Sequence, residues 1–248
     1  MAGRTIAIGD VHGDLDALTT LLSRLPTLDS GDTMVFLGDY VDSGPNSAGV
    51  VALLREELPT RTPAKIITLR GNHEDAWLKV IDEGWPGFVM PPGNGCRACY
   101  RSYRGLGPDE MMPRDDLDAL FDGSFFPPDV VKWMRGLDLW YEDQHAIYVH
   151  AGLEQVDGQW IHPQGTQDTK VLLWQRKKEF FLEYDGKTVI CGHTGTNTLP
   201  LDRDEYTPDD PNDVYWAGRS AYAIDTLAGK GGFLSAIELP SHQIYESR

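Results

Sequence analysis

Five short clusters in the sequence combine glycine with aspartate, histidine or asparagine, residue types that bind metal ions. They occupy residues 9–13, 38–42, 71–74, 150–152 and 192–194, and they follow apolar runs typical of buried strands. Because ligands bind at the carboxyl ends of strands in open α/β sheets, we expect the five clusters to converge on one crevice. Mixed oxygen and nitrogen ligands suit Mn, Fe, Zn and similar ions, whereas Ca²⁺ prefers oxygen alone. The clusters therefore predict a site for a divalent transition metal.

Four of the seven histidines lie inside these clusters: His12, His73, His150 and His193. One such histidine alone is more often a hydrogen-bonded residue near the core, because neutral imidazole satisfies many local roles. Here glycines flank the histidines and aspartates, which lets the backbone turn tightly and admits a ligand close to the chain. The joint pattern favours a metal site over unrelated structural histidines.

The elements that must position these clusters follow an alternating α/β pattern. Strand-like runs occupy residues 5–8, 33–37, 65–69, 146–149 and 188–191. Helical patterns occupy residues 15–25, 48–58, 128–135 and 171–184. Asp14 and Ser47 are the expected N-caps of the first two helices. The spacing of segments 221–225, 233–239 and 243–245 indicates an antiparallel meander at the end of the sequence.

Residues 83–126 differ in character from the rest of the sequence. They are dense in glycine, proline, methionine and aromatic residues and lack clear periodicity, so we interpret them as an insertion or cap that covers or borders the site. Cys96 and Cys99 lie there, but a structural zinc site usually needs four ligands, so we expect incidental thiols in a surface insertion. Residues 1–248 together are predicted to form a single domain.

Composition and charge argue against several classes of partner. The formal net charge of -16 repels polyanions, so we expect no nucleic-acid polymer as a partner. The first residues form no sustained apolar segment, and no apolar run approaches the roughly 20 residues of a membrane span, so we expect neither a signal peptide nor a membrane anchor. Three cysteines do not suggest a disulfide framework, which favours a reducing, cytoplasmic location.

In their order and spacing, the five clusters resemble those of the calcineurin-like metallophosphoesterases. The likeness is greater to the phosphoprotein phosphatase branch, with its Ser/Thr protein phosphatases and diadenosine tetraphosphatases, and it extends from about Arg4 to Leu239. It implies a sandwich of two mostly mixed β-sheets flanked by helices, with a dinuclear metal site at the C-terminal ends of the strands. Two divalent ions are implied, manganese first, with iron, zinc, nickel or cobalt as alternatives.

The resemblance also implies a set of metal ligands. Asp10 and His12 would bind the first metal and Asp39 would bridge to the second, whose site would be completed by Asn72, His150 and His193. A bridging carboxylate holds two ions roughly 3.5–4 Å apart, which suits a clamp on a phosphate and on the attacking oxygen. Such a pair lowers the pKa of a shared water, so that a metal-bridging hydroxide would attack phosphorus in line.

Two further residues receive catalytic roles from the resemblance. His73 would be the general acid that protonates the leaving alkoxide, and Asp42 would hold His73 as imidazolium and fix its orientation. An alternative for Asp42 is a cap of the turn at residues 43–45, because aspartate is common in turns.

The residues that would bind the substrate phosphate depart from the family pattern. The family carries an arginine after the second aspartate of its second block, whereas this sequence has Ser43, which offers one neutral donor in place of a charged fork. Arg176, at the end of a family-like segment, is the best remaining phosphate clamp. Arg70 fits either a phosphate contact or a scaffold ion pair.

Several residues near the predicted site are assigned to the scaffold instead. Trp174, Trp216 and Tyr222 are expected in the core, because aromatic side chains of this size usually serve packing. The resemblance gives Asp225, at the end of a predicted strand, a structural role.

Three functional hypotheses follow from these residues. The first is a metal-dependent phosphomonoester hydrolase of the Ser/Thr protein phosphatase type, acting on a phosphoprotein, a phosphopeptide or a small phosphoester. The second is a symmetrical dinucleoside tetraphosphate hydrolase, which is weakened by Ser43 because a polyphosphate calls for more cationic contacts. The third is a non-catalytic metal-binding scaffold, but degenerate scaffolds usually lose metal ligands and none is missing here.

Overall fold

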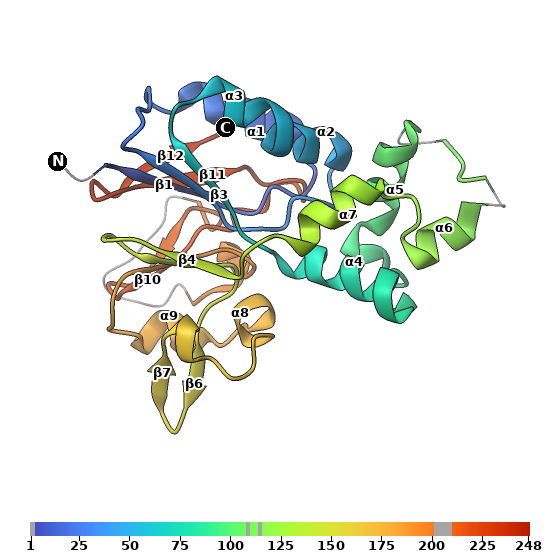
Figure 1. Ribbon diagram of the computed structural model, residues 1–248. Helices are drawn as coiled ribbons and strands as arrows, with labels where there is room; N and C mark the ends of the chain where they lie inside the picture. The colour runs from blue at the N-terminus through green and yellow to red at the C-terminus, as the bar shows by residue number, and fades with distance from the viewer. Residues whose placement is uncertain (1–2, 108–109, 114–115, 201–209) are drawn as a thin grey trace.

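Two five-stranded β-sheets stack face to face at the centre of the protein (Figure 1). The computed structural model describes residues 3–107, 110–113, 116–200 and 210–248. Helices cover the outer face of each sheet, so the layers run helix, sheet, sheet, helix. The predicted α/β class with two mixed sheets flanked by helices is confirmed.

The first sheet has the strand order β12-β11-β1-β2-β3. Its strands are β1 (Thr5–Ile8), β2 (Thr33–Phe36), β3 (Lys65–Thr68), β11 (Ser235–Leu239) and β12 (Gln243–Glu246). Strands β1, β2 and β3 are parallel, and β11 is antiparallel to both of its neighbours. Ile6 and Ile8 pack with the helices while Ala7 packs in the layer between the sheets, as the two-residue period of a strand requires.

The second sheet has the strand order β4-β5-β8-β10-β9. Its strands are β4 (Trp140–Glu142), β5 (Ile147–Val149), β8 (Val189–Cys191), β9 (Tyr215–Trp216) and β10 (Ala221–Ala223). A separate two-stranded sheet is formed by β6 (Glu154–Val156) and β7 (Gln159–Ile161). Strands β5, β8 and β10 are parallel, so their carboxyl ends meet at one edge.

The predicted antiparallel meander at the end of the chain is wrong. Strand β10 lies between β8 and β9 in the second sheet, whereas β11 and β12 form a hairpin in the first sheet. Short apolar strands show the same alternation whichever sheet they join, so the sequence pattern could not assign them. Residues 224–234 cross from one sheet to the other and run past the carboxyl end of β10.

Three helices cover the outer face of the first sheet: α1 (Leu15–Arg24), α2 (Ser47–Ala52) and α3 (Leu58–Arg61) (Figure 1). A π-helical turn, Leu53–Glu57, joins α2 to α3, so the helix predicted to end at residue 58 continues to Arg61. Pro59 lies in the first turn of α3, directly after the π-helical turn, where the Leu58 N–H bonds to the Leu53 carbonyl one residue further back than in an α-helix.

The helix predicted at residues 171–184 is instead two helices, α8 (Val171–Trp174) and α9 (Lys178–Glu183). The break occurs because Gln175 has an extended backbone, with φ -68° and ψ 143°. Both helices lie on the side of the second sheet away from the first (Figure 1). Arg176 therefore lies in the connection between them and not on a helix face.

Four more helices lie to one side of the sandwich (Figure 1): α4 (Asn72–Glu83), α5 (Cys96–Arg104), α6 (Leu117–Asp122) and α7 (Pro128–Arg135). The sequence analysis did not predict α4, because it assigned Asn72 and His73 only to the end of a strand. Two short 3₁₀ turns, Pro86–Phe88 and Pro92–Asn94, lie between α4 and α5. Segment 83–126 thus contains regular helices despite its weak periodicity.

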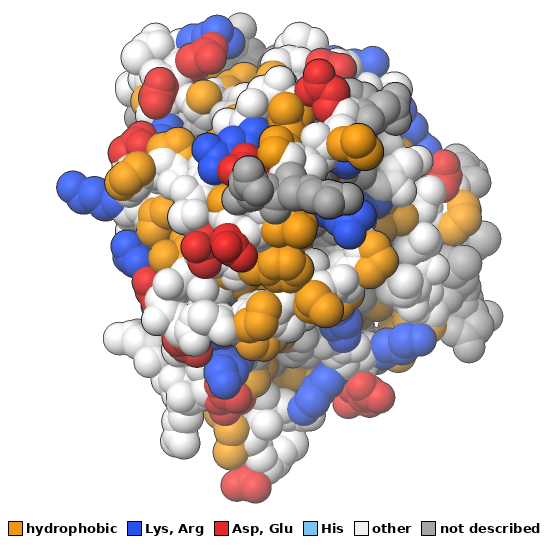
Figure 2. All heavy atoms as spheres, turned by 90° about the vertical axis from the view of Figure 1, so that its right-hand side faces the viewer, with side chains coloured by type: hydrophobic (Ala, Val, Ile, Leu, Met, Phe, Trp, Pro, Cys, Tyr) orange, Lys and Arg blue, Asp and Glu red, His pale blue; other side chains and the backbone are white. Residues whose placement is uncertain are grey.

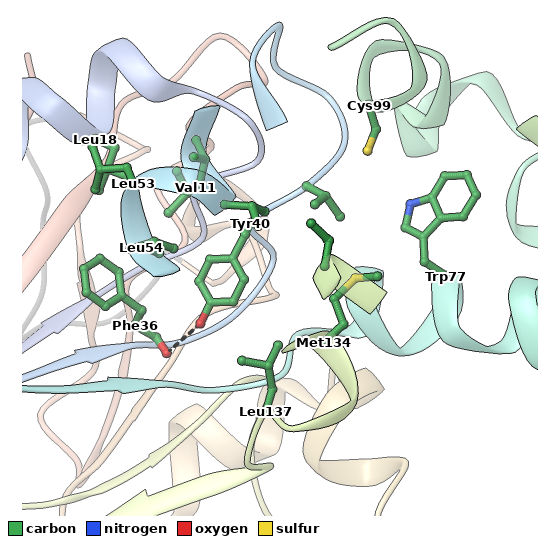
Figure 3. Packing of buried hydrophobic residues seen from close by; sticks show 14 of the residues in the cluster. Val11, Leu18, Phe36, Tyr40, Leu53, Leu54, Trp77, Cys99, Met134 and Leu137 are labelled. Atoms are coloured by element: carbon green, nitrogen blue, oxygen red, sulfur yellow. Dashed lines mark hydrogen bonds between the residues drawn. The ribbon is translucent and has the colours of Figure 1, made fainter. Parts of the chain in front are cut away.

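These helices share an apolar core with the first sheet (Figure 3). Tyr40 lies within it and donates its hydroxyl to the Leu69 carbonyl at 2.7 Å. Cys96 and Cys99 are only 2% and 0% exposed, so their assignment to a surface insertion is wrong. They are buried because α5 packs against α2 with its cysteines inward.

The outer side of these helices is mixed in character (Figure 2). Hydrophobic side chains alternate there with basic and acidic ones. Among the described residues of segment 83–126, four large hydrophobic residues are exposed: Trp85, Met90, Met111 and Leu117. Within the described residues, no helix is long and apolar enough to cross a membrane.

Candidate active site

The carboxyl ends of β1, β2, β3, β5 and β8 bring the predicted metal ligands together in a buried centre. Within the described residues, two groups of side chains hold ligand atoms within 4.8 Å of one another. One group is His12, Asp39 and His73, and the other is Asp39, His150 and His193. Asp39 belongs to both groups, which is the position that a bridging ligand requires.

The second group, with Asn72, presents acceptor atoms to one another. Nδ1 of His150 donates to the Leu37 carbonyl at 2.9 Å, which leaves Nε2 with its lone pair. That Nε2 lies 2.9 Å from Oδ1 of Asn72 and 3.4 Å from Oδ1 of Asp39. Burial lowers the pKa of His150, so its neutral form is favoured. Lone pairs that face one another repel unless a cation lies between them, so this donor set fits a metal ion.

His193 completes this set from the loop after β8, which lies in the same sheet as β5. Its Nδ1 lies 2.8 Å from the same Asn72 oxygen, and burial lowers its pKa well below the usual value. Asn72 occupies the first turn of α4, so the helix that the sequence analysis missed is the element that aims its side chain. A mixed set of two imidazoles, an amide oxygen and a carboxylate suits a first-row divalent ion.

The first site is built around His12. Its Nδ1 donates to the Val41 carbonyl at 3.2 Å, which leaves the Nε2 lone pair 3.4 Å from Oδ2 of Asp39. Asp10 belongs to neither of the two groups, but it is buried nearby and its carboxylate accepts the His193 backbone N–H at 3.0 Å. Burial, together with the charges of Asp225 and Asp39, raises the pKa of Asp10 well above its usual value. Adjacent buried carboxylates call for a cation, as the histidine lone pairs do.

Asp39 is held ionised within this centre. Burial alone would raise its pKa, but the imidazoles of His150, His73 and His12 outweigh burial and hold the pKa well below the usual range. The carboxylate also accepts the backbone N–H of His73 at 3.0 Å. The ionised form is the one that can bind two cations.

His73 and Asp42 form a buried pair beside the first site. Nδ1 of His73 lies 2.7 Å from Oδ2 of Asp42, and its Nε2 lies 3.8 Å from Oδ2 of Asp39. Burial alone would lower the pKa of His73, but the charges of Asp39 and Asp42 outweigh it and raise the pKa. The arrangement favours an imidazolium that faces the metal ligands.

Glu74 is a site residue to which the sequence analysis gave no role. Its two carboxylate oxygens accept the backbone N–H groups of Asp39, Tyr40 and Gly71 at 2.8–3.0 Å. Burial raises the pKa of Glu74 to about 7, with the charge of Asp39 adding to the effect. Glu74 therefore ties the loop after β2 to the start of α4. The only sign of its role in the sequence was its place in the 71–74 cluster.

The loops of the centre are held in an uncommon backbone conformation. His12, Asp39, Asp42, Ser43 and His193 all have positive φ angles, between 46° and 72°. Such angles are uncommon for residues other than glycine and persist only where the surroundings impose them. The sequence analysis expected tight turns at the flanking glycines. The same turns also include the candidate site residues themselves.

The candidate phosphate-binding residues lie in different surroundings. Arg176 is exposed and donates to the His193 carbonyl at 2.8 Å, which places its guanidinium beside the second site. Arg70 donates to the Arg135 carbonyl at 2.9 Å and lies 3.9 Å from a carboxylate oxygen of Asp75, contacts that favour its scaffold role.

Ser43 lies on the other side of the centre, partly covered by the start of α5. Its backbone N–H donates to the Gly95 carbonyl at 3.3 Å. A Cβ added at Gly95 would lie 2.2 Å from the Ser43 nitrogen, so the two backbones are in close contact. Segment 83–126 therefore packs directly on the position where the family carries its arginine.

A groove next to the centre is lined by Lys79, Glu83, Trp85, Lys170 and Trp174, and its volume is about 470 Å³. The Trp174 ring centroid lies 6.2 Å from that of His193. On the other side, Trp85 stacks on Phe88 at 6.1 Å, and Phe88 lies 5.3 Å from His73. Trp174 thus borders the groove as well as the core.

Trp216 is 41% exposed, so its assignment to the core is wrong. Its ring stacks on that of Tyr222 at the edge of the second sheet.

Comparison with known proteins shows the family of the chain. Residues 3–197 match the calcineurin-like phosphoesterase family, and the chain belongs to that family. It is a metallophosphoesterase, an enzyme class whose members use divalent metals.

Individual relatives differ in their named activity. The chain is 28% identical over 151 residues to a symmetrical bis(5'-nucleosyl)-tetraphosphatase of Stutzerimonas stutzeri, a match that covers 60% of this chain and 44% of that protein. The chain therefore spans less than half the length of this curated relative.

Two solved structures show the same fold at lower identity. A metallophosphoesterase from Sphaerobacter thermophilus has a TM-score of 0.54 at 19% identity, covering 99% of this chain and 87% of that one. A protein serine/threonine phosphatase from Saccharomyces cerevisiae also has a TM-score of 0.54, at 16% identity, covering 97% of this chain and 74% of that one.

Proposed function

We propose that the protein hydrolyses phosphate monoesters in the manner of the Ser/Thr protein phosphatases, with phosphoproteins, phosphopeptides or small phosphoesters as substrates. The observation that carries this proposal is that Asp39 belongs to both groups of potential ligands, while His73, a member of the first group, is held at 2.7 Å by Asp42. Manganese is the first candidate metal, ahead of iron, zinc, nickel and cobalt.

In this proposal, Asp10, His12 and Asp39 hold one metal, and Asp39, Asn72, His150 and His193 hold the other. When bound, the metals neutralise phosphate charge and supply an activated water. His73 then donates a proton from Nε2 to the leaving oxygen, and Asp42 stabilises the charged ring at Nδ1. Arg176 binds a phosphate oxygen from the exposed side of the centre.

The proposal is tested with an aryl phosphate and a set of phosphoserine, phosphothreonine and phosphotyrosine peptides. The protein is first stripped with a chelator and then loaded with each candidate metal in turn. Metal-dependent release of inorganic phosphate is expected from at least one substrate. Absence of turnover in protein shown by elemental analysis to carry two metals would overturn the proposal.

A symmetrical dinucleoside tetraphosphate hydrolase is the second candidate, and the groove between Trp85 and Trp174 favours it. Its aromatic walls suit the stacking of a nucleobase, and Lys79 and Lys170 would add positive charge for a polyphosphate. Product analysis with diadenosine tetraphosphate decides between the candidates. Efficient conversion to ADP alone, with little activity on monoesters, would favour this second function.

Three further proposals concern the chain as a whole. Residues 1–248 act as one unit in which segment 83–126 borders the substrate, since Phe88 and Gly95 contact His73 and Ser43. Three buried free cysteines are consistent with a reducing, cytoplasmic setting. A non-catalytic scaffold is the least favoured option, and protein that takes up metal but hydrolyses no phosphoester would support it.

A further inference from the structure

Lys230 reaches the metal centre from the connection between β10 and β11. Its Nζ lies 2.8 Å from Nε2 of His12, although the residue as a whole is exposed. The sequence analysis gave this lysine no role, because it lies outside the five clusters and in the part of the chain that was assigned to a meander. Its side chain therefore leads from solvent into the site.

The backbone around Lys230 is seated firmly on the first site. Gly229 has a φ of 69°, and its N–H donates to Asp14 at 3.2 Å. A Cβ at Gly229 would lie 2.3 Å from the His12 carbonyl oxygen and 3.2 Å from the Gly44 nitrogen. Close packing of this kind admits only glycine and fixes the point from which the Lys230 side chain begins.

Lys230 approaches Nε2 of His12, whose lone pair a bound metal ion would use. His12 donates from Nδ1 to the Val41 carbonyl, so its Nε2 is the acceptor for the Lys230 ammonium. A metal ion bound at Nε2 takes this lone pair and repels the ammonium. Lys230 then needs another acceptor at the rim of the site, and an incoming phosphate supplies anionic oxygens there.

Lys230 adds a second positive charge beside the centre, in addition to that of Arg176. Arg176 is exposed beside His193, at the second site, and Lys230 is exposed beside His12, at the first. The two cations thus lie beside different ligand groups, Lys230 at that of His12 and Arg176 at that of His193. Ser43, by contrast, is uncharged and has the Gly95 backbone packed against it.

We propose that Lys230 is a substrate-binding residue that contacts the phosphate group from the side of the first metal site, as Arg176 does from the side of the second. The proposal rests on the proposed phosphoesterase function, since that function supplies the anion. A lysine ammonium serves as a point charge for phosphate and does not need the bidentate geometry of an arginine. The cation that is absent at position 43 is thereby supplied from a different loop.

The test measures binding of inorganic phosphate to metal-loaded protein by calorimetry, alongside kcat and KM for an aryl phosphate. Lys230→Gln is compared with Lys230→Arg and with Lys132→Gln, which changes an exposed lysine on α7. We expect the glutamine variant to bind phosphate about tenfold more weakly and to raise KM by a similar factor, since a charged hydrogen bond is lost. Lys230→Arg should retain most of the binding, and Lys132→Gln should match the original protein.

Elemental analysis of each variant separates phosphate binding from an effect on the metals. Unchanged metal content with weaker phosphate binding in Lys230→Gln supports the proposal. Unchanged phosphate binding overturns it, as does a loss of metal that accounts for the weaker binding, and so does an original protein that binds no phosphate at millimolar concentration. If the original protein binds phosphate but hydrolyses no substrate, the proposed function fails while the role of Lys230 is still decided by calorimetry.

Discussion

The indole N–H of Trp77 donates to both carboxylate oxygens of Asp42 at 3.0 Å, and neither residue is exposed to solvent. Trp77 lies one turn along α4 from His73, whose Nδ1 contacts the same carboxylate. One helix therefore carries both the candidate acid and the group that orients its partner. Burial raises the pKa of Asp42 even so, although the hydrogen bond with His73 opposes that shift.

Trp77→Phe should leave Asp42 with one hydrogen-bond partner fewer while the aromatic packing is kept. We expect kcat for an alkyl phosphate to fall by about tenfold, because a charged hydrogen bond is worth about 1.5–3 kcal/mol and here it positions the catalytic pair. KM and metal content should stay unchanged. Trp216→Phe, an exposed tryptophan at the sheet edge, is the matched control. Equal loss of activity in both variants would assign Trp77 a merely structural role.

His73→Asn should spare metal binding and slow the release of poor leaving groups. General acid catalysis contributes about 10²–10⁴-fold, so kcat for an alkyl phosphate should fall within that range. A nitrophenyl leaving group needs little protonation, and its hydrolysis should fall much less. The measurement is kcat for a series of phosphate esters plotted against the pKa of the leaving alcohol. A uniform decrease across the series would show that His73 is not the acid.

Asp39→Asn should damage both metal sites at once, because Asp39 faces His12 through one oxygen and His150 through the other. Elemental analysis should show loss of more than one metal per chain, whereas loss of a single metal would argue against a bridging role. His193→Ala is the matched variant, since it removes a ligand from only one of the two groups. It should lower metal content by at most about one ion per chain and leave the first site able to bind.

The sequence brought the candidate metal ligands to one place because each of them follows a strand, and the ends of parallel strands meet. It also placed the strands of the first half of the chain closely, since an alternation of β and α elements prescribes their order. It could not place β10 relative to β11, because both are short and buried and neither carries a register signal.

The residues that the sequence missed act through contacts between distant segments. Glu74 binds the loop after β2, Trp77 binds Asp42, and Lys230 reaches His12 from 218 residues away. A single sequence gives no spacing rule for such contacts. The burial of Cys96 and Cys99 was missed for the same reason, because α5 becomes a core helix only through its packing on α2.

Glu74→Gln should destabilise the protein, because one of its two acceptor oxygens becomes an NH₂ group that faces a backbone N–H. The carboxylate now accepts three backbone N–H groups in a fully buried position. Leaving one or two of these donors unsatisfied should lower the free energy of unfolding by about 1–3 kcal/mol. Urea denaturation measures the loss, with the exposed Glu179→Gln on α9 as control. A variant as stable as its control would show that Glu74 does not anchor the loop.

The carboxylate of Asp32, which lies away from the metal centre, should make the stability of the protein depend on pH. Its carboxylate accepts the backbone N–H and a guanidinium N–H of Arg4 at 2.8 and 2.7 Å, and the backbone N–H of Asp29 at 3.0 Å. Burial alone would raise the pKa of Asp32, but these contacts outweigh it and lower the pKa. The ionised carboxylate therefore stabilises the fold fully above the unfolded pKa of about 3.9, and this contribution is lost as pH falls through the lower folded value.

Asp32→Asn cannot ionise, so it should be less stable than the original protein by about 1–3 kcal/mol at pH 7. The difference should stay constant down to about pH 4 and then shrink as the pH is lowered further, because the original protein loses its advantage on protonation. Urea denaturation at a series of pH values measures this. The control is Asp157→Asn in the exposed turn between β6 and β7, which should track the original protein throughout. A stability difference that grows as the pH falls would contradict the assigned direction of the shift, since it would require a folded pKa above the unfolded one.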